Sequence, residues 1–136
     1  MPWAASGRSA RWRAGARRNR LQGRDRPQPH ATKAAIPSWA TKQGFQNNKE
    51  ALAGATLFAE SACTNCHTYL GTGSSNLGAP DLSAEGAKGK GIDFQIAHLK
   101  CPSCVNSGSP MPSFAALGEQ NLRRLATFLE ASKGGQ

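Results

Sequence analysis

Apolar residues recur at the spacing of an α-helix over residues 47–60, and this pattern predicts the first helix of the chain. Leu52, Ala55 and Ala59 share one face of that helix. Gly54 interrupts it, and a glycine inside a helix costs about 1 kcal/mol relative to alanine. We therefore expect another backbone to approach this helix closely at Gly54.

The start of the same helix carries a capping signal. Asn47 can accept a hydrogen bond from the first turn, and Glu50, three residues later, would complete a capping box. The sequence therefore predicts that the helix begins directly after Asn47.

A shorter helix is predicted over residues 92–100. Ile96 and Leu99 lie three residues apart and point inward. Cys101-Pro102 then ends the helix, because proline lacks the amide proton that would continue it.

The strongest helical pattern spans residues 120–133. Leu122, Leu125 and Leu129 form an apolar stripe that Phe128 joins. Acidic Glu119 opens the segment, where an acid favours a helix start.

The segments between the helices are polar and rich in glycine, serine and asparagine. Residues 70–91 and 107–112 are therefore predicted to be loops, and no strand-like alternation of useful length occurs. The pattern as a whole predicts an all-α fold with three to five short helices.

The net charge of +9 is concentrated in the N-terminal third of the chain. Residues 1–42 hold ten Arg or Lys and one acid, whereas residues 43–136 hold seven of each sign. We therefore expect a disordered basic extension over 1–42 and one domain over 43–136. Trp3 and Trp12 leave nucleic-acid or anionic-membrane binding open for the extension, but the neutral domain argues against a nucleic-acid-binding protein. Deleting residues 1–40 should leave the stability of the domain unchanged.

The composition indicates that the domain needs stabilisation beyond its apolar core. The chain has 136 residues and a mean hydropathy of −0.51, and small domains usually rely on disulfides, a metal or a large prosthetic group. The longest near-apolar stretch, residues 51–59, is too short to span a membrane. No apolar core of a secretory signal follows the N-terminal charges.

The sequence Cys63-Thr64-Asn65-Cys66-His67 has the form of a haem-attachment motif. Two thiols at this spacing reach the two vinyl groups on one side of a porphyrin and form thioethers. The adjacent His67 then lies under the iron as the proximal ligand, and the covalent bonds retain the cofactor in a small domain.

Two other functions of this motif remain open. A zinc site could use both Cys-x-x-Cys pairs, although 34 residues separate Cys66 from Cys101, more than the usual spacing of about 15–20. A zinc site would make the protein a zinc-binding interaction module. A thioredoxin-like dithiol would need a βαβ context, and none is readable.

Met111 is the candidate for the sixth iron ligand. It is the only methionine besides the initiator, and Pro110 and Pro112 stiffen the segment that presents it. A thioether ligand raises the redox potential by favouring reduced iron. His98 is the alternative ligand, and an open iron position would instead suit an enzyme such as a peroxidase.

The region from about residue 48 to residue 133 resembles the class I cytochromes c, particularly bacterial monohaem forms and the cytochrome c domains of respiratory complexes. Five features carry the resemblance in the same order as in that family. They are Gly54-x-x-x-Phe58, Cys63-x-x-Cys66-His67, Gly78-Ala79-Pro80-Asp81-Leu82, Met111-Pro112-Ser113-Phe114 and the final leucine-rich helix.

The resemblance implies how the domain is built and what it does. The first and last helices would cross at Gly54, with Phe58 against Phe128, around one covalent haem c. Pro80 would offer its carbonyl to His67 and so tune the ligand. The protein would be an electron carrier rather than an enzyme, with no small-molecule substrate.

The resemblance also implies partners and a location. The partners would be membrane-bound or soluble redox proteins of the quinol–cytochrome c reductase and terminal oxidase types. Haem c is attached outside the cytoplasm, so we expect an extracytoplasmic location although no signal peptide is visible.

The second pair, Cys101 and Cys104, has no following histidine and should not hold another haem. A local disulfide before the Met111 segment is favoured. A metal site with His98 and a pair of reduced thiols are the alternatives.

Three lysines lie in the middle third of the chain, where they could rim the haem crevice as a docking surface or form ordinary solvated surface. They are Lys88, Lys90 and Lys100.

Overall fold

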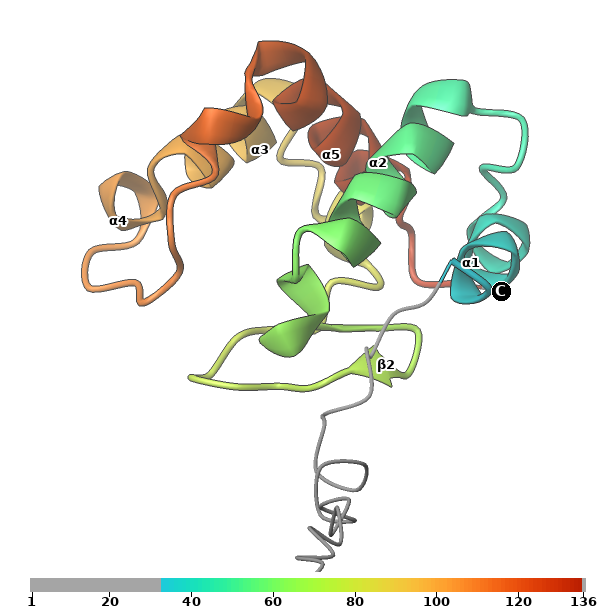
Figure 1. The fold of residues 1–136 in the computed structure, drawn as a ribbon, viewed down its shortest axis with the longest axis horizontal. Helices are drawn as coiled ribbons and strands as arrows, with labels where there is room; N and C mark the ends of the chain where they lie inside the picture. Colours follow the sequence, from blue (N-terminus) through green and yellow to red (C-terminus); the bar gives the residue numbers. More distant parts are fainter. Residues whose placement is uncertain (1–32, 136) are drawn as a thin grey trace, which may run out of the picture.

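The structure is a computed structural model that describes residues 33–135, and within them the fold is mainly helical (Figure 1). The α-helices are α1 (Ala35–Gln43), α2 (Lys49–Glu60), α3 (Ile92–Lys100), α4 (Pro102–Val105) and α5 (Glu119–Ala131). Single turns of 3₁₀ helix are η2 (Cys63–Asn65), η3 (Glu85–Lys88) and η4 (Ala115–Leu117). Strands β1 (Thr68–Tyr69) and β2 (Thr72–Gly73) pair antiparallel, with Thr68 opposite Gly73. The all-α prediction is confirmed.

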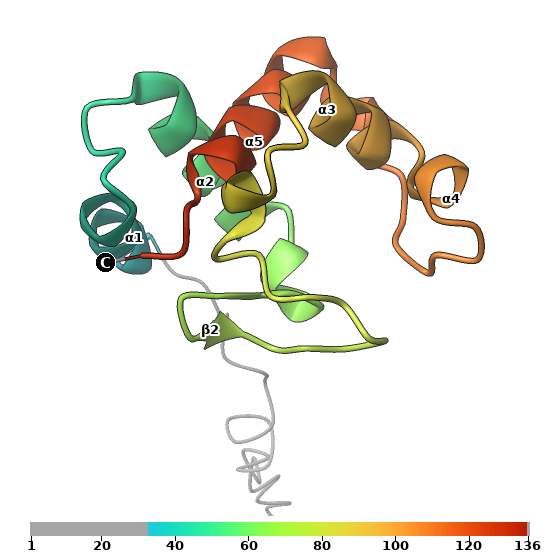
Figure 2. The same cartoon turned by 180° about the vertical axis from the view of Figure 1, so that it is seen from behind.

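Helices α2 and α5 cross in direct backbone contact (Figures 1 and 2). A Cβ atom on Gly54 would clash with the carbonyl oxygen of Arg124 and with the Cβ of Phe128. The ring of Phe58 packs against that of Phe128 at a centroid distance of 5.1 Å. The predicted close approach at Gly54 and the predicted aromatic pair are therefore both present.

The core around this crossing is aromatic. Trp39 lies 4.8 Å from Tyr69 and 6.2 Å from Phe128 between ring centroids, and Phe45 meets Phe128 edge to face at 5.7 Å. All of these rings are buried. Aromatic pairs in such orientations contribute about 0.5–1.5 kcal/mol beyond the area that they bury.

The predicted domain boundary at residue 43 is wrong, because α1 belongs to the folded domain. Ile36, Trp39 and Ala40 on one side of α1 are buried in the core. The domain therefore extends back at least to Ala35. The sequence did not predict α1 because its apolar face is short and follows a long basic segment. Deleting residues 1–40 would remove Trp39 from the core, so the prediction that this deletion leaves the stability unchanged is wrong. Residues 1–32, where the disordered tail was predicted, lie outside the described residues.

The local predictions need smaller corrections. The N-cap of α2 is Asn48, whose Oδ1 accepts from the amide of Ala51 at 3.1 Å, so the capping box from Asn47 to Glu50 does not form. Strand β2 and η3 lie within residues 70–91, where a loop was expected, and β1 directly precedes that segment. Helix α3 has the predicted bounds, and Pro102 then begins α4.

The end of the described chain is fixed beside the end of α1 (Figure 2). The Oε1 of Gln43 accepts from the amides of Lys133, Gly134 and Gly135 at 2.8–3.1 Å, and its Nε2 donates to the carbonyl of Ser83 at 2.6 Å. One polar side chain thus joins three distant parts of the chain.

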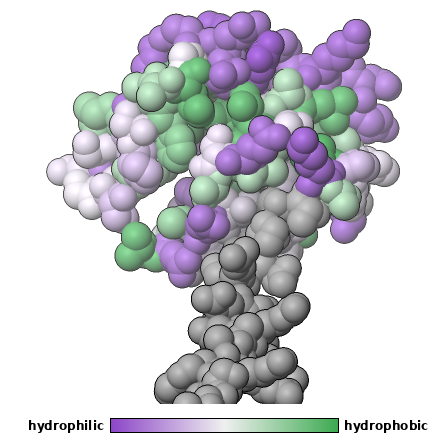
Figure 3. All heavy atoms as spheres, in the orientation of Figure 1, coloured by the Kyte–Doolittle hydropathy of each residue, from purple (hydrophilic) through white to green (hydrophobic). Residues whose placement is uncertain are grey.

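The remaining segments form an arch on the other side of the molecule. Helices α3 and α5 lie at the top, α4 hangs from one end, and the segment of residues 66–82 crosses below (Figure 1). The space-filling view shows a hollow between these parts (Figure 3). The haem motif and the Met111 segment both come from segments around this hollow.

Candidate haem site

The Cys-x-x-Cys-His segment forms one tight turn at the end of α2. Ala62 adopts a left-handed conformation with φ 63°, which ends the helix and starts η2. The carbonyl of Cys63 then accepts from the amides of both Cys66 (3.2 Å) and His67 (2.9 Å). The two thiols and the imidazole are therefore carried on a single compact turn.

The imidazole of His67 is oriented by a backbone carbonyl. Its Nδ1 lies 2.8 Å from the carbonyl oxygen of Pro80. A carbonyl can only accept, so Nδ1 carries the proton in the neutral ring, and Nε2 presents its lone pair. This arrangement prepares Nε2 to bind a metal.

Residues 80–83 are held against the haem motif by a second set of hydrogen bonds, which keeps Pro80 in place. Leu82 donates its amide to the carbonyl of Thr68 at 2.9 Å. Asp81 accepts from the hydroxyl of Thr68 at 2.6 Å and from the amide of Ser83 at 2.9 Å. Burial opposes ionisation of Asp81, but these bonds prevail and lower its pKa.

The supporting roles of Thr68 and Ser83 were not predicted. The spacing of Asp81 and Ser83 is that of an Asx turn, which could have indicated the local bond. The bond to Thr68 joins residues 13 positions apart and has no local signature.

The loop after β2 folds back onto the motif. Ser74 donates its amide to the carbonyl of Thr64, and Asn76 donates its amide to that of Cys66, both at 3.0 Å. The side chain of Asn76 also donates to the carbonyl of Asn65 at 2.5 Å. The backbone between the two thiols is therefore fixed from outside the motif.

The Cys63 thiol lies in a largely buried environment. Burial raises the pKa of Cys63 to about 12, and the neighbouring Cys66 adds to the rise, while a backbone hydrogen bond opposes it. Cys63 and Cys66 are both free and half-buried, as a pair available for thioether bonds must be.

Met111 lies in the segment on the opposite side of the hollow. It is half-buried and packs on the edge of the core. Other half-buried apolar side chains from the segments around the hollow also pack on the core. They are Cys63, Leu82, Phe114 and Leu117. These side chains could cover the faces of a large apolar cofactor.

His98 lies on α3 and is half-buried. Burial lowers its pKa, and the charges of Lys90 and His67 lower it further against the opposing effect of Glu85. A neutral imidazole in this position keeps His98 as the alternative to Met111.

Cys101 and Cys104 form a disulfide, with their Cα atoms 5.3 Å apart. The pairing favoured from the sequence is therefore present, and the alternative metal site with His98 is not. In residues 33–135 no group of three or more His, Cys, Asp or Glu side chains is arranged to hold a metal ion.

The three lysines considered for docking are all paired with acids. Lys88 and Lys90 lie 2.9 Å and 3.6 Å from the carboxylate of Glu85, and Lys100 pairs with Glu119. They therefore do not form a patch of unpaired positive charge.

Two thiols and one imidazole nitrogen on a single turn, with one thioether on the segment across the hollow (Figure 1), form a set of groups that fits haem. Such a helical domain is built to hold one porphyrin by covalent bonds and by iron coordination.

Comparison with known proteins makes the assignment more particular. The family model described as Cytochrome c matches residues 51–133, more than half of the chain. Neither the curated proteins nor the solved structures give a match. The protein belongs to the cytochrome c family, which carries covalently bound haem c and transfers electrons.

Within residues 33–135, none of the helices has the length and apolar character needed to cross a bilayer.

Proposed function

We propose that the protein is an extracytoplasmic one-electron carrier of a respiratory chain, with haem iron held between His67 and Met111. Its partners would be of the quinol–cytochrome c reductase and terminal oxidase types, and it would have no small-molecule substrate. The observation that carries the proposal is the contact between His67 Nδ1 and the Pro80 carbonyl, which leaves Nε2 free for iron.

In such a carrier, different residues of the chain have different roles. Cys63 and Cys66 tether the cofactor, and the Pro80 carbonyl keeps the His67 ring in one orientation. The apolar side chains beside Met111 exclude water, and low polarity around a redox centre helps to set its potential. Haem c, when bound, supplies a one-electron iron couple.

A sixth ligand distinguishes the carrier from an enzyme. A peroxidase needs an open iron position, and Met111 would close it. Met111 is also the only thioether in the described part of the chain, so substituting it tests the proposal directly.

The variant Met111→Ala should retain haem but lose the weak far-red absorption band of a methionine–iron(III) bond. Its midpoint potential should fall by about 0.1–0.2 V, a fraction of the roughly 0.8 V over which axial ligands set haem potentials. Spectroelectrochemical titration of the holoprotein measures both quantities.

Met111→His is the matched variant, because it restores a sixth ligand without the thioether. It should also lack the far-red band and have a low potential, but should not gain the peroxide reactivity expected of an open position in Met111→Ala. A native protein that lacks the far-red band, with a potential that Met111→Ala leaves unchanged, would assign the ligand role to His98.

A further inference from the structure

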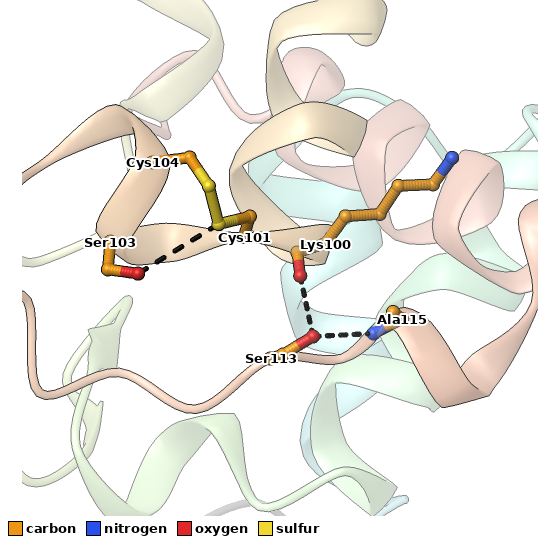
Figure 4. The surroundings of a disulfide bond; sticks show 6 residues. All are labelled: Lys100, Cys101, Ser103, Cys104, Ser113 and Ala115. Carbon is orange, nitrogen blue, oxygen red and sulfur yellow. Dashed lines mark hydrogen bonds between the residues drawn. A yellow bond between two sulfur atoms is a disulfide. The ribbon is translucent and has the colours of Figure 1, made fainter.

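The segment that carries Met111 is a closed excursion from the core, which we call the Met111 loop (residues 101–113). Its two ends are joined where the amide of Phe114 donates to the carbonyl of Leu99 at 2.8 Å. Ser113 Oγ donates to the carbonyl of Lys100 at 2.5 Å beside it (Figure 4). Loops of this length with adjoining ends are compact surface units.

Inside the Met111 loop, the restraints besides the disulfide are the core contact of Met111 and a few short-range hydrogen bonds, among them those from the amides of Cys104 and Asn106 to the carbonyls of Cys101 and Pro102. Pro102 is its only buried residue. Helix α4 has four residues, too few to be stable by itself. Beyond α4, Ser109 donates its amide to the carbonyl of Asn106 at 3.0 Å, and Met111 donates its amide to Ser109 Oγ at 3.3 Å. The Cys101–Cys104 bond is therefore the one covalent restraint between the base of the loop and Met111.

The same disulfide is open to attack. Cys104 is exposed and Cys101 is half-exposed, and Ser103 Oγ lies 3.9 Å from Cys101 Sγ (Figure 4). An incoming thiolate can reach Cys104 Sγ, while the hydroxyl of Ser103 faces the sulfur that would leave. Exposed disulfides are the labile ones, in contrast to buried structural bridges.

The surroundings of the disulfide favour a protein dithiol as the reductant. The Met111 loop contains no charged residue, and Val105 next to Cys104 is 43% exposed. The nearest lysine, Lys100, is paired with Glu119. Such a neutral, partly apolar surface offers nothing to attract a small anionic thiol, but it fits an uncharged protein face.

We propose that Cys101–Cys104 is a thiol–disulfide exchange site for a dithiol protein, and that its oxidation state sets how firmly the loop holds Met111. A partner thiolate attacks Cys104 Sγ, the bond to Cys101 breaks, and Cys101 leaves as a thiolate and takes up a proton. The second partner thiol then releases Cys104 as a thiol. The partner becomes a disulfide, and two electrons and two protons have passed to this chain.

The effect on Met111 rests on the proposed function, whereas the exchange chemistry does not. The first experiment therefore requires no iron ligation by Met111. The holoprotein is incubated in dithiothreitol buffers of graded potential, and its cysteines are alkylated and counted by mass spectrometry. Hydrogen exchange of the loop amides is measured in parallel.

We expect Cys101 and Cys104 to become alkylated together while the fold remains intact. Amide exchange in residues 104–111 should rise by roughly fivefold, the factor that corresponds to about 1 kcal/mol of loop restraint. Exchange in α2 and α5 should stay unchanged. A disulfide that resists dithiol until the domain unfolds, or reduction that leaves loop exchange unchanged, would overturn the proposal.

The double variant Cys101→Ser/Cys104→Ser is the matched control, because its hydroxyls replace thiols that cannot pair. Its loop should exchange rapidly with or without dithiothreitol. In its oxidised iron state, imidazole should displace Met111 at roughly fivefold lower concentration than in the native protein.

The two proposals fail in different ways. A native protein without a far-red band would show that Met111 is not a ligand, and the exchange site would stand on alkylation and loop mobility alone. A native band with equal imidazole affinity in the serine variant would show that the disulfide does not control Met111.

Discussion

Glu85 is an acid whose side chain is only 7% exposed, held at the point where η3 meets α3 and α5. Burial opposes its ionisation, but hydrogen bonds from Lys88 (2.9 Å) and Gln95 (3.2 Å) and the charge of Lys90 prevail and lower its pKa. Lys88 and Lys90, which the sequence left open as a docking surface, thus neutralise this carboxylate, and Glu85 has a structural role.

Glu85→Gln should lower the free energy of unfolding at pH 7 by about 1–2 kcal/mol, since hydrogen bonds to a charged group are worth about 1.5–3 kcal/mol. The folded-state pKa lies below the unfolded value of 4.5. Ionised Glu85 therefore stabilises the protein above about pH 4.5, and this contribution is lost as the pH falls through the folded-state pKa.

Denaturant titrations at pH 7 and pH 3 measure this effect. The difference between the native protein and Glu85→Gln should shrink at the lower pH. Glu119→Gln, at an acid that is 70% exposed, is the control and should change stability little at either pH. A constant difference between the two pH values would contradict the role of the charge.

At the scale of elements, the crossing of α2 and α5 depends on the absence of one side chain. Gly54→Ala places a Cβ against the carbonyl of Arg124 and the Cβ of Phe128. Overpacking of this kind costs about 1–3 kcal/mol, whereas the same change on an open helix face would stabilise the helix.

Thermal unfolding of the holoprotein checks this prediction. Thr56→Ala in the same helix is the control, because it shortens a half-buried side chain without filling a contact. An unchanged melting temperature in Gly54→Ala would show that the helices can separate at no cost.

The elements that the sequence predicted correctly are those with a local cause. Helix α3 ends just before Cys101-Pro102, and a glycine such as Gly54 is costly in a helix unless a close contact requires it. Helix α1 was missed because its buried face, Ile36 with Trp39 and Ala40, is short and adjoins a long basic segment. Gln43 was missed because hydrogen bonds to residues 40 and 90 positions away leave no pattern in the neighbouring sequence.

In the candidate site, too, most of the residues with a local sequence signature were predicted and those held by long-range contacts were not. Cys63, Cys66 and His67 were found because attachment chemistry dictates their spacing, and Pro80 was found through family resemblance. The bond from Thr68 to Asp81 was not predicted, because it depends on how the segment of residues 80–83 returns to β1. The bond from Ser83 to Asp81 is a local Asx turn, which the spacing of the two residues could have indicated.

At the scale of the whole molecule, α1 closes the aromatic core from one side. Trp39 contacts Phe58, Tyr69 and Phe128, which come from α2, β1 and α5. The domain is therefore one cooperative unit that includes α1.

Trp39→Ala should lower the free energy of unfolding by about 3–5 kcal/mol, the usual cost of removing a large buried aromatic side chain. Guanidinium titration of the holoprotein measures it. Ser38→Ala, exposed on the same helix, should change stability by less than about 0.5 kcal/mol. If both variants were equally stable, α1 would not be part of the domain.

The hydrogen bonds of Gln43 hold residues 133–135 beside the end of α1, so α1 and the end of the described chain both lie on the side of the molecule away from α4 (Figure 1). A covalent tether attached at α1 or at residue 135 would therefore join the domain on the side away from α4. Swinging on such a tether would change where the hollow points without moving His67 relative to Pro80.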